Sequence, residues 1–289
     1  MKNQLIAAFI GCAVLLASHS SSADQTFVSE TRFADDSDNN TLFEQGFQVW
    51  TPHTSFIDVG IQYQYRSFKQ TDTDSIMLLG DARLNPIGVS FAAGYDSHLH
   101  EPVGHGTLSY WYSYGSLELT YEKDLVDSQL GLQDKISFEH TYLTKEFNYH
   151  DQFILVGRIG QTEYSDNVRN DWWALTGIYP MNDNFNLIAQ RESDEFNKWS
   201  PYYFSPQDYS RTLVGVGTYH QLGQFEFLSR LLYGTQNVES NRETSYYARF
   251  NISRPVEFLN ASVGVEAIFD QKEPDYRYDQ LTVNFQKSF

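Results

Sequence analysis

Residues 56–68 read Phe-Ile-Asp-Val-Gly-Ile-Gln-Tyr-Gln-Tyr-Arg-Ser-Phe, and apolar and polar residues alternate through most of this stretch. The residues at odd positions from 57 to 65 are aliphatic or aromatic, and those at even positions from 58 to 66 are polar or glycine. Successive side chains of a β-strand point to opposite faces, so the stretch predicts a strand with one apolar and one polar face. The segments Leu259–Phe269 and Leu281–Phe289 show the same alternation.

Turn residues separate such segments along the whole chain after Asp24, and no helical spacing of apolar residues is sustained there. The pattern predicts an all-β chain without an internal domain boundary. About sixteen strands are expected, near residues 26–35, 41–51, 55–68, 75–84, 87–96, 105–114, 117–125, 135–146, 152–163, 171–180, 184–194, 208–220, 223–235, 243–252, 258–270 and 276–289.

The connections between the expected strands alternate between two kinds. The short connections are Pro52–Thr54, Asn85-Pro86, Gly115-Ser116, Asn182-Asp183, Leu222-Gly223 and Pro255–Glu257. The longer ones are Asp35–Asn40, Lys69–Asp74, Ser97–Gly104, Asp127–Lys135, Glu195–Asp208 and Asn237–Glu243. Short turns on one side and longer loops on the other are typical of a transmembrane antiparallel up-and-down β-barrel.

Composition narrows the class of protein. The 289 residues carry a formal net charge of −17, which argues against nucleic acid as a partner because phosphates are bound by clustered Lys and Arg. The mean hydropathy is −0.47, and after the N-terminal region no apolar run is long enough for a membrane-spanning helix. The only cysteine is Cys12, so a disulfide framework is not expected beyond the leader.

Residues 1–23 have the features of a secretory signal peptide. Lys2 precedes the apolar segment Leu5–Ala17, and the small residues Ser21 and Ala23 stand where signal peptidase reads its site. We therefore expect cleavage after Ala23, a barrel formed by residues 24–289, and a location in the bacterial envelope.

A soluble β-sandwich would also show alternation, but two features favour a barrel in lipid. Aromatic rings, which suit the membrane–water boundary, recur near strand ends at Phe27, Phe33, Tyr65, Tyr95, Tyr114, Tyr121, Phe153, Phe185, Tyr219 and Tyr233. The opposite face carries charges that a dry core would not accept and that are expected to line a wet lumen: Glu30, Arg32, Glu44, Asp58, Arg66, Asp81, Arg83, Glu118, Glu122, Glu139, Arg158, Glu226, Arg230, Arg249 and Glu266. These charges would either pair across strands and stiffen the wall or set the selectivity of a channel.

The chain ends on an aromatic residue, Phe289, with Phe285, Val283 and Leu281 at alternate positions before it. This ending is similar to the C-terminal signal read by the assembly machinery of bacterial outer-membrane barrels. We expect that machinery and outer-membrane lipid to be partners. An even number of strands would place both termini in the periplasm.

The longest expected connection, Glu195–Asp208, is rich in aromatic residues. Trp199, Tyr202, Tyr203 and Phe204 could stack on sugar rings and so form an outer glycan contact. The alternative is a folded loop whose rings pack on the barrel rim.

The segment Tyr202–Arg211, which leads into a strand containing Gly215 and Gly217, resembles the late part of the barrels of bacterial exopolysaccharide-secretion proteins of the cellulose and poly-N-acetylglucosamine systems. The resemblance implies a sixteen-stranded barrel that conducts a growing glycan outward. Members of that family carry periplasmic tetratricopeptide repeats before the barrel, whereas here the first strand follows the expected cleavage site. Coupling to a synthase would then need a separate periplasmic protein.

Catalytic and metal sites are not expected. His98, His100 and His105 lie in a stretch that reads as a loop, where solvated histidines are the simpler interpretation. Ser137 and His140 have opposite strand parity, so they cannot serve one nucleophilic site. No cofactor motif is found.

Three functions remain open at this point. The first is passage of a polysaccharide, and the second is a general or substrate-specific diffusion porin for small solutes. The third, an outer-membrane hydrolase, is disfavoured because no catalytic constellation was found. The sequence does not identify the transported molecule, whether the lumen is open or plugged, or the oligomeric state.

Overall fold

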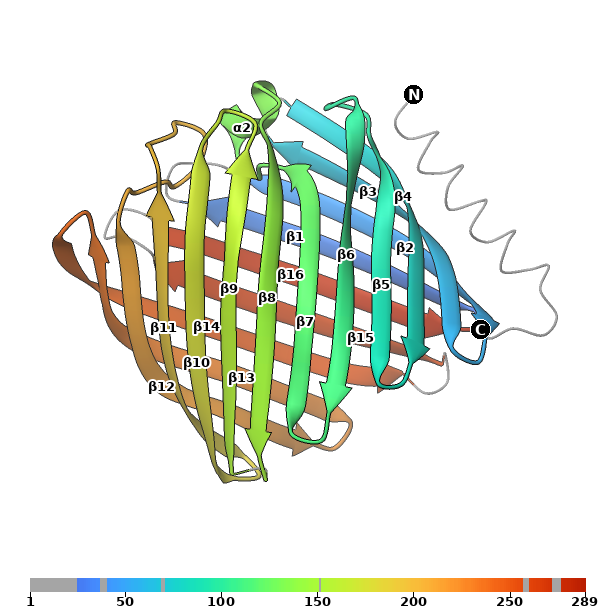
Figure 1. Ribbon diagram of the computed structural model, residues 1–289. Helices are drawn as coiled ribbons and strands as arrows, with labels where there is room; N and C mark the ends of the chain where they lie inside the picture. Colours follow the sequence, from blue (N-terminus) through green and yellow to red (C-terminus); the bar gives the residue numbers. More distant parts are fainter. Residues whose placement is uncertain (1–24, 37–40, 69–70, 151, 257–259, 272–276) are drawn as a thin grey trace.

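The computed structural model describes residues 25–36, 41–68, 71–150, 152–256, 260–271 and 277–289. Sixteen strands form one closed barrel, in which each strand is antiparallel to its neighbours and β1 pairs with β16 (Figure 1). The strands are β1 (Thr26–Asp36), β2 (Leu42–Thr54), β3 (Ile57–Phe68), β4 (Thr71–Leu84), β5 (Ile87–Asp96), β6 (Glu101–Tyr112), β7 (Gly115–Leu125), β8 (Ser137–Tyr149), β9 (Phe153–Tyr164), β10 (Arg169–Asn182), β11 (Phe185–Phe196), β12 (Tyr209–Leu222), β13 (Phe225–Val238), β14 (Asn241–Val256), β15 (Ala261–Gln271) and β16 (Arg277–Ser288). The short helix α2 spans Gln129–Gln133. The prediction of an all-β, up-and-down antiparallel barrel with about sixteen strands is confirmed.

Some strands are longer than the sequence pattern indicates. β6 already begins at Glu101, so the loop expected at Ser97–Gly104 is shorter. β13 and β14 are joined by Glu239 and Ser240, whose φ angles of 48° and 77° are those of a two-residue type I′ hairpin turn, rather than by a loop. The expected signal peptide lies outside the described residues, as do 37–40 and 69–70 of two expected loops.

The two ends of the barrel differ. At the end called here the terminal end, Thr26 pairs with Ser288, and the backbone N–H of Phe289 donates to the carbonyl of Gln25 at 2.9 Å. Several turns at this end have two residues, such as 85–86 and 223–224. The opposite end, called the loop end, carries the connections 126–136 and 197–208 and the helix α2 (Figure 1).

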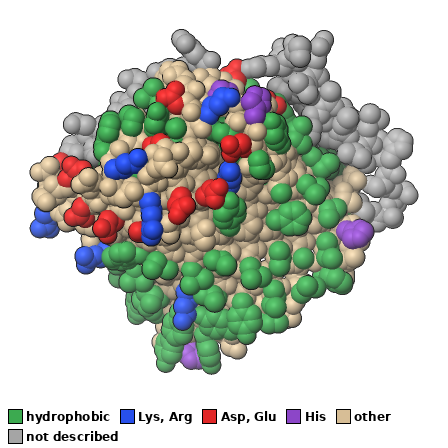
Figure 2. All heavy atoms as spheres, turned by 45° about the horizontal axis from the view of Figure 1, so that its top comes forward, with side chains coloured by type: hydrophobic (Ala, Val, Ile, Leu, Met, Phe, Trp, Pro, Cys, Tyr) green, Lys and Arg blue, Asp and Glu red, His purple; other side chains and the backbone are tan. Residues whose placement is uncertain are grey.

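The outer face of the barrel is apolar over much of its height. Figure 2 shows hydrophobic side chains forming a broad band, with charged side chains gathered nearer the loop end. Exposed outer residues include Leu78, Phe91, Leu119, Ile159, Leu175, Val214 and Leu231. A closed barrel satisfies the backbone groups of all its strands internally, so an apolar outer band suits it to lipid.

The described residues include no helix long and apolar enough to span a membrane.

Candidate functional site in the lumen

Contacts between distant strands identify the inner face. Arg66 on β3 forms an ion pair with Asp124 on β7, although three strands separate β3 from β7 in the sheet. These two side chains meet across the interior, and the strand register then assigns each position of every strand to the inner or the outer face.

The register places most of the expected lumen charges on the inner face. The set comprises Glu30, Arg32, Glu44, Asp58, Arg66, Asp81, Arg83, Glu118, Glu122, Arg158, Glu226, Arg230, Arg249 and Glu266. Glu139 is a correction: it pairs with Lys123 on the outer face, where the two side chains form an ion pair of 3.4 Å. Tyr219, expected among the outer rings, lies on the inner face opposite Leu228.

The inner face of β8–β11 carries an aromatic pocket near the loop end. The hollow has a volume of about 350 Å³ and is lined by Phe138, His140, Tyr164, Asn170, Trp172 and Asp194, among others. The ring of His140 is stacked on Trp172, with centroids 5.1 Å apart and planes 5° apart. Tyr142 lies 5.7 Å from Trp172, one position further towards the terminal end. Three neighbouring strands, β8, β9 and β10, therefore supply flat rings to one patch of wall, and β11 adds the carboxylate of Asp194.

A close approach of backbone and ring holds the indole of Trp172 in place. A Cβ atom on Gly160, the cross-strand neighbour of Trp172, would lie 2.8 Å from its Cζ2 atom, so only glycine fits there without a shift. Two polar atoms of this pocket, Trp172 Nε1 and Asn170 Oδ1, are buried and have no hydrogen-bond partner among the described residues. Unpaired buried polar groups are rare in folded proteins.

The loop 197–208 extends this aromatic surface. Tyr203 stacks on Tyr164 with centroids 4.0 Å apart, and its hydroxyl donates to Asp166 Oδ1 at 3.1 Å. Burial raises the pKa of Tyr203 above its ordinary value, so its phenol stays protonated and keeps donating. Phe204 packs edge-on against Tyr209 at 5.6 Å.

The other two rings of this loop are placed differently. The carbonyl of Tyr202 accepts a hydrogen bond from Ser128 Oγ in the loop 126–136, and a side-chain hydrogen bond with Asp134 raises the pKa of Tyr202. The Trp199 side chain is 68% exposed. Of the four aromatic residues expected to contact glycan, Tyr203 and Phe204 thus pack on other rings, and Trp199 presents most of its surface.

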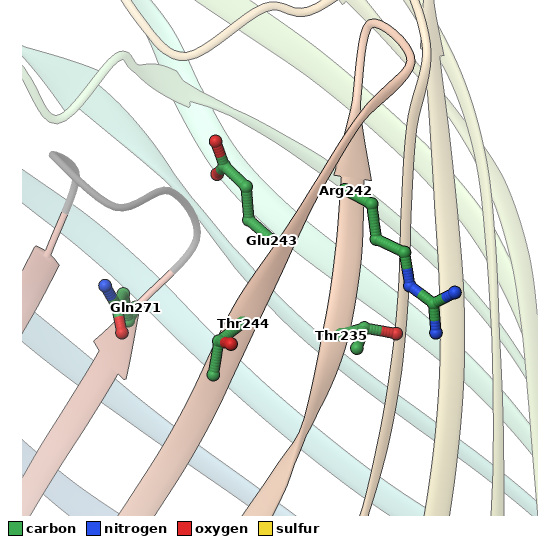
Figure 3. A pocket seen from close by; sticks show the side chains of 5 residues that line it. All are labelled: Thr235, Arg242, Glu243, Thr244 and Gln271. Atoms are coloured by element: carbon green, nitrogen blue, oxygen red, sulfur yellow. The ribbon is translucent and has the colours of Figure 1, made fainter.

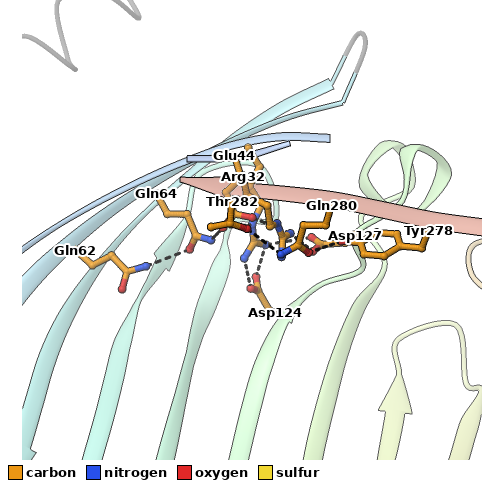
Figure 4. A network of polar contacts seen from close by, with 10 residues as sticks. Arg32, Glu44, Gln62, Gln64, Asp124, Asp127, Tyr278, Gln280 and Thr282 are labelled. Carbon is orange, nitrogen blue, oxygen red and sulfur yellow. Dashed lines mark hydrogen bonds and ion pairs between the residues drawn. The ribbon is translucent and has the colours of Figure 1, made fainter. Parts of the chain in front are cut away.

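The loop 126–136 folds over the opposite side of the mouth. Asp127 forms an ion pair with Arg32 at 2.7 Å, and Arg32 also pairs with Glu44 at 2.7 Å. Figure 4 shows this network together with Asp124 and a row of hydrogen-bonded amides on the wall. Asp127 therefore attaches the loop to Arg32 on β1 and to Arg66 on β3, and Glu44 on β2 pairs with both arginines.

Apolar contacts complete that attachment. Leu132 of α2 is fully buried in a cluster with Ala34, Leu42, Phe68 and Val103, all of which have inner-face parity. Its carbonyl also lies 2.6 Å from His98 Nε2. The loop 126–136 thus covers the part of the lumen next to β1–β6.

The three histidines considered as metal ligands lie on two different elements. His98 and His100 lie in the connection 97–100, whereas His105 is on the inner face of β6. Among the described residues no group of three His, Cys, Asp or Glu side chains could hold a metal ion. A further hollow of about 510 Å³ lies beside the β13–β14 hairpin, where Arg242 and Glu243 extend to opposite sides of β14 (Figure 3). Its lining includes no aromatic side chain among the described residues.

Sequence reasoning did not find the pocket around Trp172. The signal was present: Trp172 and Trp173 are adjacent, so one of them must face inward, and His140 has the parity of the inner wall. Knowing that these residues meet required the register of β8, β9 and β10, which the alternation pattern does not supply.

No family model and no curated protein matches this sequence. Solved structures do match its fold. One, described as a bacterial polysaccharide outer membrane secretin, aligns with a TM-score of 0.76 at 11% identity, over 92% of this chain and 98% of that chain. OccK7 (OpdD) of Pseudomonas aeruginosa aligns with a TM-score of 0.51 at 11% identity, over 92% of this chain and 98% of its own. A loop-deletion mutant of OmpT, an outer membrane protein of Vibrio cholerae, aligns with a TM-score of 0.52 at 10% identity, over 93% of this chain and 99% of that chain.

At these identities the likeness concerns the fold, because one fold carries many functions. The predicted resemblance to a polysaccharide-secretion barrel is confirmed at that level. The chain has the sixteen-stranded fold of bacterial outer-membrane barrels.

Proposed function

We propose that this protein is an outer-membrane channel through which a polysaccharide passes, with the terminal end in the periplasm and the loop end outside. The aromatic pocket on β8–β11 carries the proposal. Flat rings suit the C–H faces of sugar rings, and the polar side chains of Asn170 and Asp194 in the same lining suit sugar hydroxyls. The high fold similarity to a polysaccharide secretin supports the same function.

In this proposal the inner-face charges line the passage, and Trp199 contacts the glycan at the outer mouth. The polymer leaves on the side of β8–β14, since the loop 126–136 covers the side of β1–β6. A separate periplasmic protein would couple the channel to a synthase.

The test is current block in planar bilayers by a neutral oligosaccharide, cellohexaose. We expect Trp172→Ala to weaken block about tenfold, which corresponds to ~1.4 kcal/mol of lost binding. Trp173→Ala is the matched control, because Trp173 is the next residue and faces outward beside Arg191, 5.9 Å from its ring. Equal block in the two variants and the wild type would contradict a role for the pocket.

A diffusion porin for small solutes is the second candidate. The folds of OccK7 and OmpT and the many charged groups on the inner face favour it. This alternative predicts steady ionic current that cellohexaose leaves unchanged in the wild type.

A further inference from the structure

A second aromatic hollow lies at the terminal end of the same wall. It has a volume of about 550 Å³, and its lining includes Trp111, Tyr114, Glu118, Glu146 and His150 from β6–β8 and the turns that join β6–β9. It shares strand β8 with the pocket around Trp172.

Trp111 faces the lumen and not lipid. Its neighbours Tyr110 and Tyr112 have outer-face parity and stack on each other at 6.3 Å, as expected of rings at a membrane boundary. Trp111 has the opposite parity and is 41% exposed. A tryptophan in a lipid-facing girdle would have the parity of the two tyrosines, so Trp111 needs another explanation.

The ring of Trp111 lies against the backbone of the neighbouring strand β5. A Cβ atom on Gly88 of β5 would be 2.2 Å from Trp111 Cη2, so the indole occupies the space that a side chain would take. The backbone N–H of Trp111 also donates to the carbonyl of Pro86 at 2.8 Å. The ring is thus positioned before any ligand arrives, which lowers the entropy cost of stacking on it.

Two carboxylates line the same hollow as this ring. Glu118 and Glu146 are inner-face residues of the neighbouring strands β7 and β8, and both line the hollow. Their carboxylates make no ion pair or hydrogen bond within the described part of the chain, unlike Glu44 and Glu266, which pair with arginines. Vicinal sugar hydroxyls can donate to such carboxylates, whereas an anionic sugar would be repelled.

The spacing of the two hollows suits one extended ligand. Glu146 and His140 are six residues apart on β8, which corresponds to ~20 Å along the strand. Tyr142 and Thr144 lie on the inner face between them.

We infer that the lumen has a second sugar-binding subsite at its terminal end, where the ring of Trp111 and the carboxylates of Glu118 and Glu146 bind a neutral pyranose unit, and that one glycan chain contacts this subsite and the Trp172 pocket together. The inference rests on the proposed function and adds the place where the polymer enters.

The experiment compares block by cellohexaose added to either side of a bilayer that holds inserted wild type, Trp111→Ala, Trp111→Phe or Tyr110→Ala. Tyr110 is the matched control because it is the preceding residue on the same strand and faces outward. For addition at the terminal end we expect Trp111→Ala to lower the rate of block about tenfold. Trp111→Phe should recover most of that rate, and Tyr110→Ala should match the wild type. Ionic conductance equal to that of the wild type shows that each variant has folded.

Three different results would contradict the inference. If cellohexaose blocks the wild type and Trp172→Ala weakens block but Trp111→Ala does not, the entrance subsite is wrong and the proposed function stands. If cellohexaose blocks no form of the protein from either side, the proposed function fails and the subsite fails with it. A loss in Trp111→Ala that is the same from both sides would also contradict a role in entry.

Discussion

At the scale of single residues, strand parity decides what each side chain does. Trp172 and Trp173 have the same chemistry, yet one stacks on His140 in the lumen and the other faces outward beside Arg191. Arg66 shows the same principle for charge. Its side chain is 11% exposed, and it lies between the carboxylates of Glu44 and Asp124 inside the barrel.

Arg66→Met tests this inner network at the residue scale. The change leaves the partly buried Asp124 without its cation, and removing one partner of a buried ion pair costs about 3 kcal/mol. We expect that loss in the free energy of unfolding, measured by urea titration in lipid vesicles. Arg83→Met is the control, because Arg83 is 75% exposed and pairs with Asp81 at 3.0 Å, so its loss should cost under about 1 kcal/mol. An equal loss of unfolding free energy in the two variants would show that the Arg66 network stabilises the barrel no more than the exposed Arg83–Asp81 pair does.

At the scale of elements, the loop 126–136 is the part of the fold that the pattern of strands does not describe. Its sequence predicts one of the longer connections, and Asp127 in it forms ion pairs with Arg32 and Arg66 inside the mouth. The helix α2 follows Ser128, whose Oγ accepts from the backbone N–H of Gly131 at 2.9 Å as an N-cap. The cap and the ion pairs give a short loop one defined position over the lumen.

Leu132→Asp tests whether that position restricts the channel. Leu132 is fully buried, and its burial stabilises the closed loop by about 2 kcal/mol, so a carboxylate there should release the loop. We expect larger single-channel conductance than in the wild type. Leu130→Asp is the control on the same helix, because Leu130 is 48% exposed and should leave conductance unchanged. Conductance that stays at the wild-type value in Leu132→Asp would mean that the loop lies beside the conducting path.

At the scale of the whole molecule, alternation and turn residues were enough to predict a closed barrel, because both signals are local and sixteen repeats of them leave few other folds. Contacts between strands that are not neighbours were not predictable in this way. Arg66 and Asp124, or Trp172 and His140, are brought together by the register of several strands. The ring of Phe289 lies at the terminal end, with its centroid 4.4 Å from Lys287 Nζ, and its role as an assembly signal stays a prediction.

The charge of the inner wall leads to a prediction for the whole barrel. Carboxylates outnumber guanidinium groups there: Asp124, Glu146, Glu192, Asp194 and Asp270 add to the acids expected from sequence, whereas Arg211 is the added base. Arg211 is itself paired with Glu192 and Asp270.

The reversal potential in a KCl gradient should therefore show a preference for cations, which weakens towards 1 M salt, where the Debye length is about 3 Å. Glu118→Gln with Glu122→Gln should reduce the preference, because both residues face the lumen. Glu139→Gln with Glu163→Gln changes the net charge equally on the outer face and should leave the preference intact. A similar shift in both double variants would mean that the selectivity follows the charge of the whole protein and not that of its inner wall.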